Sequence, residues 1–276
     1  MMRKRAALVS RYSVIIETIF HRTFAPGNRR VRFDRSQFNA VARDLNFPAI
    51  SNVGDIVYSF RYRTPIPPSI QAKAPQGYSW IILGAGDAAY EFRLAIPGKI
   101  APAPNRTEIK IPDATPEIFK RYAPGMDEQA LLTKIRYNRI LDIFTGMACY
   151  SIQNHYRTKV PSIGQIEIDE VYVGVSKNGA HYVMPCQAKS PGDSFGAAQV
   201  YQDLALCHTQ YPHAICRPIG MQFKSEDSLA IIHIQLEEVD EIFYMTVSDE
   251  KHYRLVSSNG VQATDLAQYR ADDNHV

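Results

Sequence analysis

Residues 165–189 are the most informative stretch of the chain, and they read Gln165-Ile-Glu-Ile-Asp-Glu-Val-Tyr-Val-Gly-Val-Ser-Lys-Asn-Gly-Ala-His-Tyr-Val-Met-Pro-Cys-Gln-Ala-Lys189. Two short apolar runs flank a turn signal that contains Asn178-Gly179, which is the pattern of a β-hairpin. Acidic residues stand early in the first run, and Gln187 and Lys189 end the second. A hairpin that brings carboxylates, an amide and a lysine to one end can hold a divalent metal and a phosphate.

The length of the hairpin loop decides which polar side chains share a face. A two-residue loop of Asn178-Gly179 places Glu170 directly opposite Gln187. Directly opposite residues share a face, and their Cβ atoms lie roughly 5 Å apart. This register therefore gathers Glu170, Gln187 and Lys189 on one side of the hairpin.

A three-residue loop over residues 177–179, with a left-handed glycine, is the alternative. For that register we expect Glu167 and Asp169 on the face of Cys186 and Ala188. A β-bulge would then be needed for Asp169 to join the amide and the lysine, because one extra residue redirects a side chain. The sequence leaves open which acid belongs to the site.

Length and composition set the broad class of the protein. The 276 residues leave room for one large or two ordinary domains, and 45% apolar with 21% charged residues is ordinary for a soluble globular protein. No run of about 18 apolar residues occurs, and Arg11 follows the short N-terminal apolar run, so we expect neither a membrane partner nor a secretory leader. The four cysteines lack CxxC spacing, which favours reduced thiols in a cytoplasmic protein over a zinc site.

Charge is distributed unevenly along the chain. Residues 1–64 carry twelve Lys/Arg and four Asp/Glu, a balance of +8, whereas residues 224–276 carry four and eleven, a balance of −7. A basic first quarter is typical of a surface that meets phosphates, and a solubilising charged face is the alternative. Aromatic residues alternate with arginines over residues 58–63, which favours nucleic acid as the partner.

The first quarter has the pattern of a small helical module. Asp34 followed three residues later by Gln37 is similar to a capping box, and proline residues end the third helical stretch. The periodicity predicts three helices and then two strands, over residues 6–22, 34–45, 50–60, 78–83 and 88–94. Three helices followed by a β-hairpin is the order of a winged helix-turn-helix. We therefore predict a winged-helix-like DNA-binding domain over residues 1–96.

A second domain is predicted after a proline-rich linker. Six prolines fall between residues 97 and 125, which is the pattern of a linker or an extended arm. Beyond it we expect a long helical region, the hairpin, a second helix and three strands, over residues 127–157, 165–189, 193–207, 214–223, 231–236 and 242–247. The second domain is predicted to cover residues 126–276.

The hairpin and its flanks resemble the PD-(D/E)XK nuclease superfamily over about residues 130–225. Ile168-Asp169 takes the place of the "PD", and Gln187-Ala188-Lys189, which begins eighteen residues later, takes the place of "(D/E)xK". The run Glu-Ile-Asp that ends in Asp169 favours Asp169 over Glu170 in this comparison. The resemblance implies an α/β (α+β) fold with a restriction-endonuclease-like αβββαβ core and a mixed sheet.

Gln187 departs from the family pattern, in which an acid usually stands at this position. An amide can bind a hard cation through its carbonyl oxygen, but it brings no charge. Glu170 or Glu167 could supply the missing charge. A glutamine in the following helix, Gln199, is a second-tier candidate, because some relatives place a glutamine near the metal.

The family mechanism is metal-assisted phosphodiester hydrolysis. The resemblance implies that Asp169 and Gln187, with Glu170 as a further candidate, hold Mg²⁺, which polarises the phosphate and lowers the pKa of a bound water. It implies that Lys189 orients or activates the attacking water and offsets charge that develops on the phosphate. A solvent-exposed strand end is the alternative role for Lys189.

Candidate DNA contacts lie in both predicted domains. Arginine and lysine side chains that meet phosphates position a protein on DNA, and contacts to base edges specify the sequence. At the end of the helix expected before the hairpin, polar residues one turn apart could reach a phosphate. The candidates are Arg61, Arg63, Arg29, Arg30, Arg32, Arg35, Gln153, His155 and Arg157.

The sequence thus predicts a Mg²⁺-dependent DNA endonuclease of the type II restriction kind. The expected partner is double-stranded DNA, and a homodimer is expected because both strands must be cut. A structure-specific or repair nuclease is the first alternative. The second is a DNA-binding regulator without catalytic activity, built on a nuclease scaffold.

Overall fold

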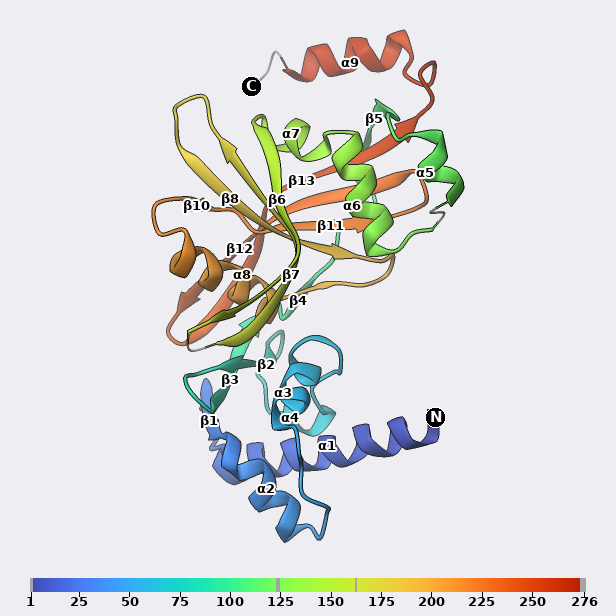
Figure 1. Cartoon of the computed structure of the whole chain (residues 1–276). Helices are drawn as coiled ribbons and strands as arrows, with labels where there is room; N and C mark the ends of the chain where they lie inside the picture. The colour runs from blue at the N-terminus through green and yellow to red at the C-terminus, as the bar shows by residue number, and fades with distance from the viewer. Residues whose placement is uncertain (1, 123–124, 162, 274–276) are drawn as a thin grey trace.

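A large mixed β-sheet runs through the whole protein in the computed structural model, which describes residues 2–122, 125–161 and 163–273. The strand order is β1-β3-β13-β12-β11-β8-β7-β6, and β2, β5 and β10 pair at its sides. The N-terminal elements form one end of the molecule, and α9 lies at the other end (Figure 1). The chain is therefore a mixed α/β protein, in agreement with the broad fold class that the sequence predicted.

The three predicted N-terminal helices are confirmed. The helices are α1 (Met2–Thr23), α2 (Arg35–Asp44) and α3 (Val53–Tyr62). The backbone N–H of Asp34 donates to Gln37 Oε1 at 2.6 Å, which forms the capping box at the start of α2. Asn52 caps α3 by accepting from the N–H of Asp55 at 3.3 Å. These boundaries follow from short-range chemistry that the sequence displays.

The antiparallel end of the large sheet completes the N-terminal part, together with the short helix α4 (Pro68–Gln71). Its strands are β1 (Arg30–Asp34), β2 (Ser79–Gly84) and β3 (Ala89–Ile96), and β3 pairs with both of the others. The predicted hairpin of β2 and β3 is confirmed, whereas β1 was not predicted. The ring of Phe20 on α1 lies 5.2 Å from that of Trp80 and 4.9 Å from that of Phe92, so one apolar core joins the helices to this sheet.

The stretch predicted as a linker contains regular structure in its described residues. Its elements are β4 (Lys99–Ile100), β5 (Glu108–Pro112) and α5 (Glu117–Tyr122), and residues 123–124 lie outside the described residues. Strand β5 pairs in parallel with β13, and β4 pairs with β9, because the described prolines fall between these elements or, in the case of Pro112, at the last position of a strand. The predicted domain boundaries stay a prediction.

The predicted long helix over residues 127–157 is wrong in its second half. The structure has α6 (Glu128–Tyr137), α7 (Ile140–Thr145) and then the strand β6 (Ala148–Val160). Gly146, at a φ of +68°, ends α7. Residues 148–160 then pair antiparallel with β7, and pairing of this length overrides a weak helical pattern.

The hairpin strands stand in the middle of the C-terminal part, between α6 and α7 on one face and α8 on the other. Strands β6, β7 (Gly164–Val175) and β8 (His181–Lys189) form an antiparallel meander. The helix α8 (Ala197–Gln210) then leads to β11 (Ile219–Phe223), which runs parallel to β8. The remaining elements are β9 (Phe195–Gly196), β10 (Ile215–Cys216), β12 (Ser228–Val239), β13 (Ile242–Val256) and α9 (Ala263–Asp273).

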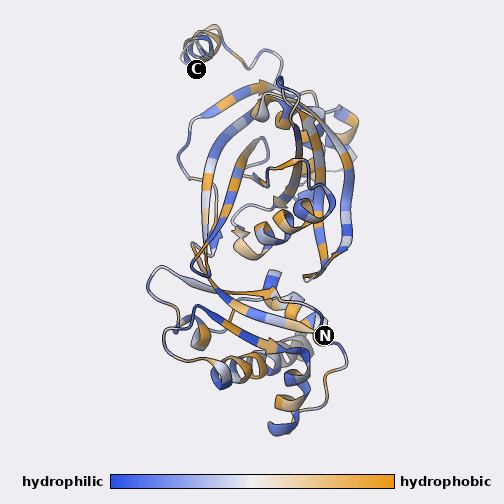
Figure 2. Ribbon diagram, turned by 90° about the vertical axis from the view of Figure 1, so that its left-hand side faces the viewer, coloured by the Kyte–Doolittle hydropathy of each residue, from blue (hydrophilic) through white to orange (hydrophobic). Residues whose placement is uncertain are grey.

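Apolar and polar residues alternate along the long curved strands of this part (Figure 2). The alternation lets each strand bury one set of side chains under α6 and α7 and another under α8. All four cysteines are unpaired thiols, and Cys149, Cys186 and Cys207 are buried. Among the described helices, none combines the length and the apolar character needed to cross a membrane.

Candidate functional site

The hairpin loop is the three-residue form, which decides between the two predicted registers. Ser176 N–H donates to the Ala180 carbonyl at 2.9 Å, and Gly179 has a φ of +79°. Glu170 therefore stands opposite Cys186 rather than Gln187. Because directly opposite residues share a face, it is Glu170, and not Asp169, that joins the face of Cys186. Both predicted groupings of the side chains were wrong.

Glu170 lies apart from the amide and the lysine, under α6. Its side chain is fully buried and accepts a hydrogen bond from Ser151 Oγ at 2.5 Å, and Arg136 Nε lies 3.4 Å from the same oxygen. Burial raises the pKa of this carboxyl, and the contacts with Ser151 and Arg136 oppose that rise. The structure thus separates Glu170 from the other residues that were predicted to form the site.

Asp169 is brought to the end of β8 without a β-bulge in the β7–β8 ladder. The antiparallel pairing of β7 with β8 ends at Glu170. Its neighbour Asp169 instead uses its side chain, and Asp169 Oδ2 accepts a hydrogen bond from the N–H of Ala188 at 2.7 Å. Ala188 is the residue between Gln187 and Lys189. Burial raises the pKa of Asp169, while this hydrogen bond and the charge of Lys189 lower it. Asp169, Gln187 and Lys189 therefore form one group, named here the hairpin site.

A buried carboxylate that sequence reasoning missed belongs to the hairpin site. Asp203 on α8 is 1% exposed, and its Oδ1 accepts from Gln187 Nε2 at 2.9 Å. Burial raises the pKa of Asp203 well above its usual range, although the Gln187 hydrogen bond opposes the rise. Asp203 thus holds the amide nitrogen of Gln187, and the carbonyl oxygen of Gln187 has only the long contact with Gln199 within the described structure. In the sequence, Asp203 carries no signal except its spacing along a helix that also holds Gln199.

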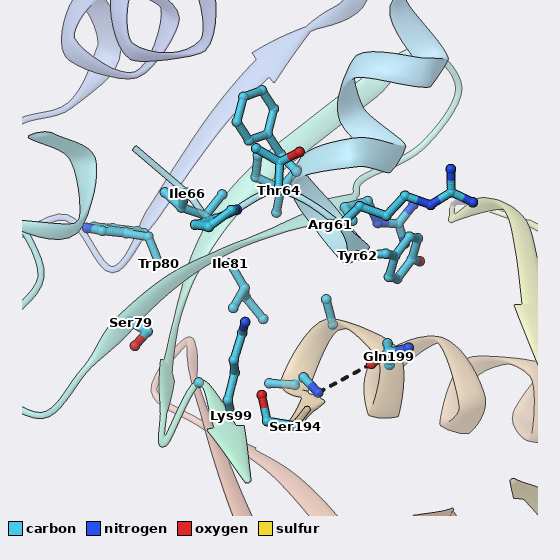
Figure 3. Close-up of a pocket in the computed structure, with 18 of the residues that line it drawn as sticks. Arg61, Tyr62, Thr64, Ile66, Ser79, Trp80, Ile81, Lys99, Ser194 and Gln199 are labelled. Carbon is cyan, nitrogen blue, oxygen red and sulfur yellow. Dashed lines mark hydrogen bonds between the residues drawn. The ribbon is translucent and has the colours of Figure 1, made fainter. Parts of the chain in front are cut away.

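Gln199 and Gln202, also on α8, connect the hairpin site to its surroundings. Gln199 Nε2 lies 3.5 Å from Gln187 Oε1, at the limit of a hydrogen bond, and Gln199 Oε1 accepts from the N–H of Gly196 at 3.4 Å (Figure 3). Gln202 is 2% exposed, and it accepts from Tyr62 Oη at 2.6 Å and donates to the Glu167 carbonyl at 3.0 Å. The end of α3 is therefore in contact with the helix that positions Gln187.

The side chain of Glu167 points to positively charged and aromatic neighbours. Arg157 Nη2 lies 2.9 Å from its Oε1, and Tyr58 Oη lies 3.5 Å from its Oε2. Its charge acts on the pKa of Asp169, which places it near the hairpin site. Glu167 is thus a neighbour that is already engaged in an ion pair.

The oxygen ligands of the hairpin site suit a cation that keeps most of its water. Over the described residues, histidine, cysteine, aspartate and glutamate side chains nowhere gather in threes that could hold a metal ion. The hairpin site offers the Asp169 carboxylate and the Gln187 carbonyl. Mg²⁺ often binds through one or two carboxylates plus substrate phosphates and keeps several waters. This donor set fits Mg²⁺ better than zinc, which takes four nitrogen or sulfur ligands in structural sites.

The basic residues in β1 and just before it are engaged with other groups of the same chain. Arg30 Nη2 lies 2.5 Å from Glu91, Arg32 Nε lies 3.6 Å from Glu91, and Arg29 donates to the Asp240 carbonyl at 3.1 Å. Arg35 is exposed at the start of α2. Some of the opposite charges thus form ion pairs that hold the basic N-terminal part against the acidic β12–β13 hairpin. DNA contact by these arginines stays a prediction.

The other predicted DNA contacts lie on α3 and on β6. Arg63 is exposed and packs on the Tyr58 ring, whereas the Nε and Nη2 atoms of Arg61 are buried without a hydrogen-bond partner in the described structure. The expected helix end that would carry Gln153, His155 and Arg157 does not exist, because these residues lie exposed on the strand β6. They line the outer strand of the meander rather than a helical turn.

Comparisons with protein-family models, with curated proteins and with solved structures found no match for this chain. The fold and the hairpin site therefore define only a class, a mixed α/β protein with a carboxylate, an amide and a lysine grouped where two sheet strands diverge.

The buried carboxyl of Asp203 predicts a stability that falls as the pH rises. The folded chain binds this proton more tightly than the unfolded chain, whose carboxyl has a pKa near 3.8. The free energy of unfolding should therefore fall from about pH 4 upward, until the folded carboxyl has ionised. Asp203→Asn keeps an acceptor for the Gln187 amide but cannot ionise, so we expect a smaller slope in urea unfolding between about pH 5 and about pH 8.5.

Asp113→Asn is the matched control for this measurement. Burial raises the pKa of Asp113, but hydrogen bonds from Thr115, Lys120 and Asn138 outweigh it and lower the pKa to about 2. This carboxylate stabilises the fold above its ordinary pKa, and the stabilisation is lost as the pH falls toward about 2. Its removal should lower stability at neutral pH and leave the slope above pH 5 unchanged. An Asp203→Asn slope equal to that of the wild type would contradict the prediction.

Proposed function

We propose that the protein is a Mg²⁺-dependent DNA endonuclease that hydrolyses phosphodiester bonds. The observation that carries the proposal is the hairpin site, in which the Asp169 carboxylate accepts a hydrogen bond from the peptide N–H between Gln187 and Lys189. A carboxylate, an amide oxygen and a lysine are what a cation and a phosphate need at one place.

The order of elements supports the proposal. Helices α6 and α7, the meander β6-β7-β8, the helix α8 and the parallel strand β11 follow one another as in the αβββαβ core of PD-(D/E)XK nucleases. The three helices and the β2–β3 hairpin of the N-terminal part have the order of a winged helix-turn-helix. Both likenesses concern topology, so they support the nuclease class and not a particular substrate.

Each residue of the hairpin site has a role in this proposal. Asp169 and Gln187 would hold the cation, with Asp203 fixing the amide so that its oxygen faces the cation. The bound ion would polarise the phosphate and lower the pKa of a water. Lys189 would orient the attacking water and offset the charge that develops on the phosphate. Asp203 also restores a carboxyl near the position where the family has an acid and this chain has Gln187.

A sequence-specific type II restriction enzyme that acts on double-stranded DNA as a homodimer in the cytoplasm is the first form of this proposal. A structure-specific nuclease is the second, and the position of α3 favours it. In a winged helix-turn-helix one helix enters the major groove. Here two tyrosines of α3 contact the C-terminal part, with Tyr62 Oη 2.6 Å from Gln202 and Tyr58 Oη 3.5 Å from Glu167. That side of α3 is therefore covered.

Incubation of the purified protein with plasmid and with branched DNA, in Mg²⁺ or in EDTA, tests the proposal. Discrete fragments in Mg²⁺ alone support the restriction form, and cleavage of branched DNA alone supports the structure-specific form. Asp169→Asn should abolish cleavage with either substrate, whereas Asp87→Asn, an exposed acid in the β2–β3 turn, should not. Binding of DNA without cleavage of either substrate would overturn both forms and favour a regulator.

A further inference from the structure

A cleft of about 640 Å³ separates the N-terminal part from α8, beside the hairpin site. One wall is made by the end of α3 and the loop that follows it, and the others by β2, β4 and the first turn of α8. Lys189 of the hairpin site belongs to the lining. The side chain of Lys99, from β4, extends into this space toward Ile81 (Figure 3).

The cleft contains more positive than negative side chains. Its basic lining residues are Arg61, Arg63, Lys99 and Lys189, and its acidic ones are Glu128 and Asp193. Within the described structure, neither Lys99 nor Lys189 forms a salt bridge, while most other basic residues near the join of the two parts are paired. Four basic side chains from three separate segments line a space that has two acidic side chains, and this excess of positive charge makes the space attractive to an anion.

The volume of the cleft sets the size of that anion. Small-molecule pockets measure about 300–1,000 Å³, and 640 Å³ falls within this range. A space of this size is that of a small-ligand site, which suits part of one unpaired strand better than two paired strands. Apolar side chains in the lining, Ile66 and Ile81 together with Pro65 and Pro97, offer surface for the face of a base.

We infer that the cleft binds a single DNA strand, with Lys99 and Lys189 at phosphates of that strand. This inference rests on the proposed nuclease function and narrows its substrate to DNA with an unpaired strand, such as a flap or a branch. The strand would lie between the loop that follows α3 and the first turn of α8, and present a phosphodiester bond to the hairpin site. Lys99 is then a substrate-binding residue that the sequence pattern did not indicate.

Fluorescence anisotropy in EDTA tests the inference without cleavage. A labelled single-stranded DNA of 12 nucleotides should bind more tightly than the matching duplex. Lys99→Ala should weaken binding of the single strand about tenfold, and should reduce the slope of log affinity against log salt by about 0.7. Lys99→Arg should restore binding. Lys251→Ala, an exposed lysine of β13, is the matched control and should change neither quantity.

The outcomes separate this inference from the proposed function. Equal or tighter binding of the duplex, or equal effects of Lys99→Ala and Lys251→Ala, would overturn the inference even if plasmid DNA is cleaved. Single-strand binding that depends on Lys99, without cleavage of any DNA in Mg²⁺, would overturn the nuclease and leave the cleft as a strand-binding site. A preference for an RNA strand of the same sequence would contradict the assignment to DNA.

Discussion

Lys189→Ala should lower the rate of Mg²⁺-dependent DNA cleavage by about 10²–10⁴-fold. Lys189 ends β8 two residues after Gln187, and its charge acts directly on Asp169 and on Asp203. The variant removes the group that would position the water and offset charge on the phosphate, and these interactions grow toward the transition state. We expect the loss in kcat, measured by single-turnover cleavage at saturating protein.

Lys177→Ala is the matched control, because Lys177 lies exposed in the loop of the same hairpin. It should cleave at the wild-type rate. Circular dichroism of both variants checks that the fold is kept, and Lys189→Arg tests whether charge alone suffices. Cleavage by Lys189→Ala within threefold of the control would exclude Lys189 from the reaction.

Glu91→Ala should lower the free energy of unfolding by about 3–5 kcal/mol. Glu91 is 4% exposed and joins arginines of two strands, with Arg93 Nη1 at 3.0 Å and Arg30 Nη2 at 2.5 Å. Arg93 is also 4% exposed, so the variant leaves a buried guanidinium with Glu238 as its remaining carboxylate partner. The reduced compensation of this buried charge, rather than the lost attraction to the more exposed Arg30, causes most of the cost. Urea unfolding at constant pH measures it.

Glu237→Ala removes an exposed glutamate of β12, the strand that also carries Glu238, and should change stability by less than about 0.5 kcal/mol. The effect of Glu91→Ala should persist in high salt, because buried pairs are poorly screened. A loss below 1 kcal/mol would contradict a buried network that holds the N-terminal part against the β12–β13 hairpin.

The ion pairs of the N-terminal arginines change how the uneven charge along the chain is interpreted. The sequence indicated a basic first quarter that faces phosphates. In the structure, Arg29 and Arg30 lie against Asp240 and Glu241 at the tip of the acidic β12–β13 hairpin. Opposite net charges in the two ends of the chain therefore serve partly to join them. Lys99 and Lys189, which form no salt bridge within the described structure, are therefore better candidates for phosphate contact than Arg29 and Arg30.

Local chemistry made several elements predictable. The capping box of Asp34 and Gln37 and the Asn52 cap act over three residues, so the sequence displays the starts of α2 and α3 directly. The Asn178-Gly179 turn likewise predicts the β7–β8 hairpin. The strand β6 was missed because the residues after Gly146 are polar on the exposed edge of the sheet, and only pairing with β7 distinguishes them from a helix end.

The sequence by itself determined the hairpin, the helix caps and the presence of Asp169, Gln187 and Lys189 within one local unit. Only the tertiary structure decided that Glu170 turns away under α6, that Asp203 holds the Gln187 amide, and that Lys99 faces the cleft. The physical reason is the reach of the interactions. Caps and turns join residues a few positions apart, whereas the hydrogen bond from Tyr62 to Gln202 spans 140 positions and forms only when the sheet has brought the two parts together.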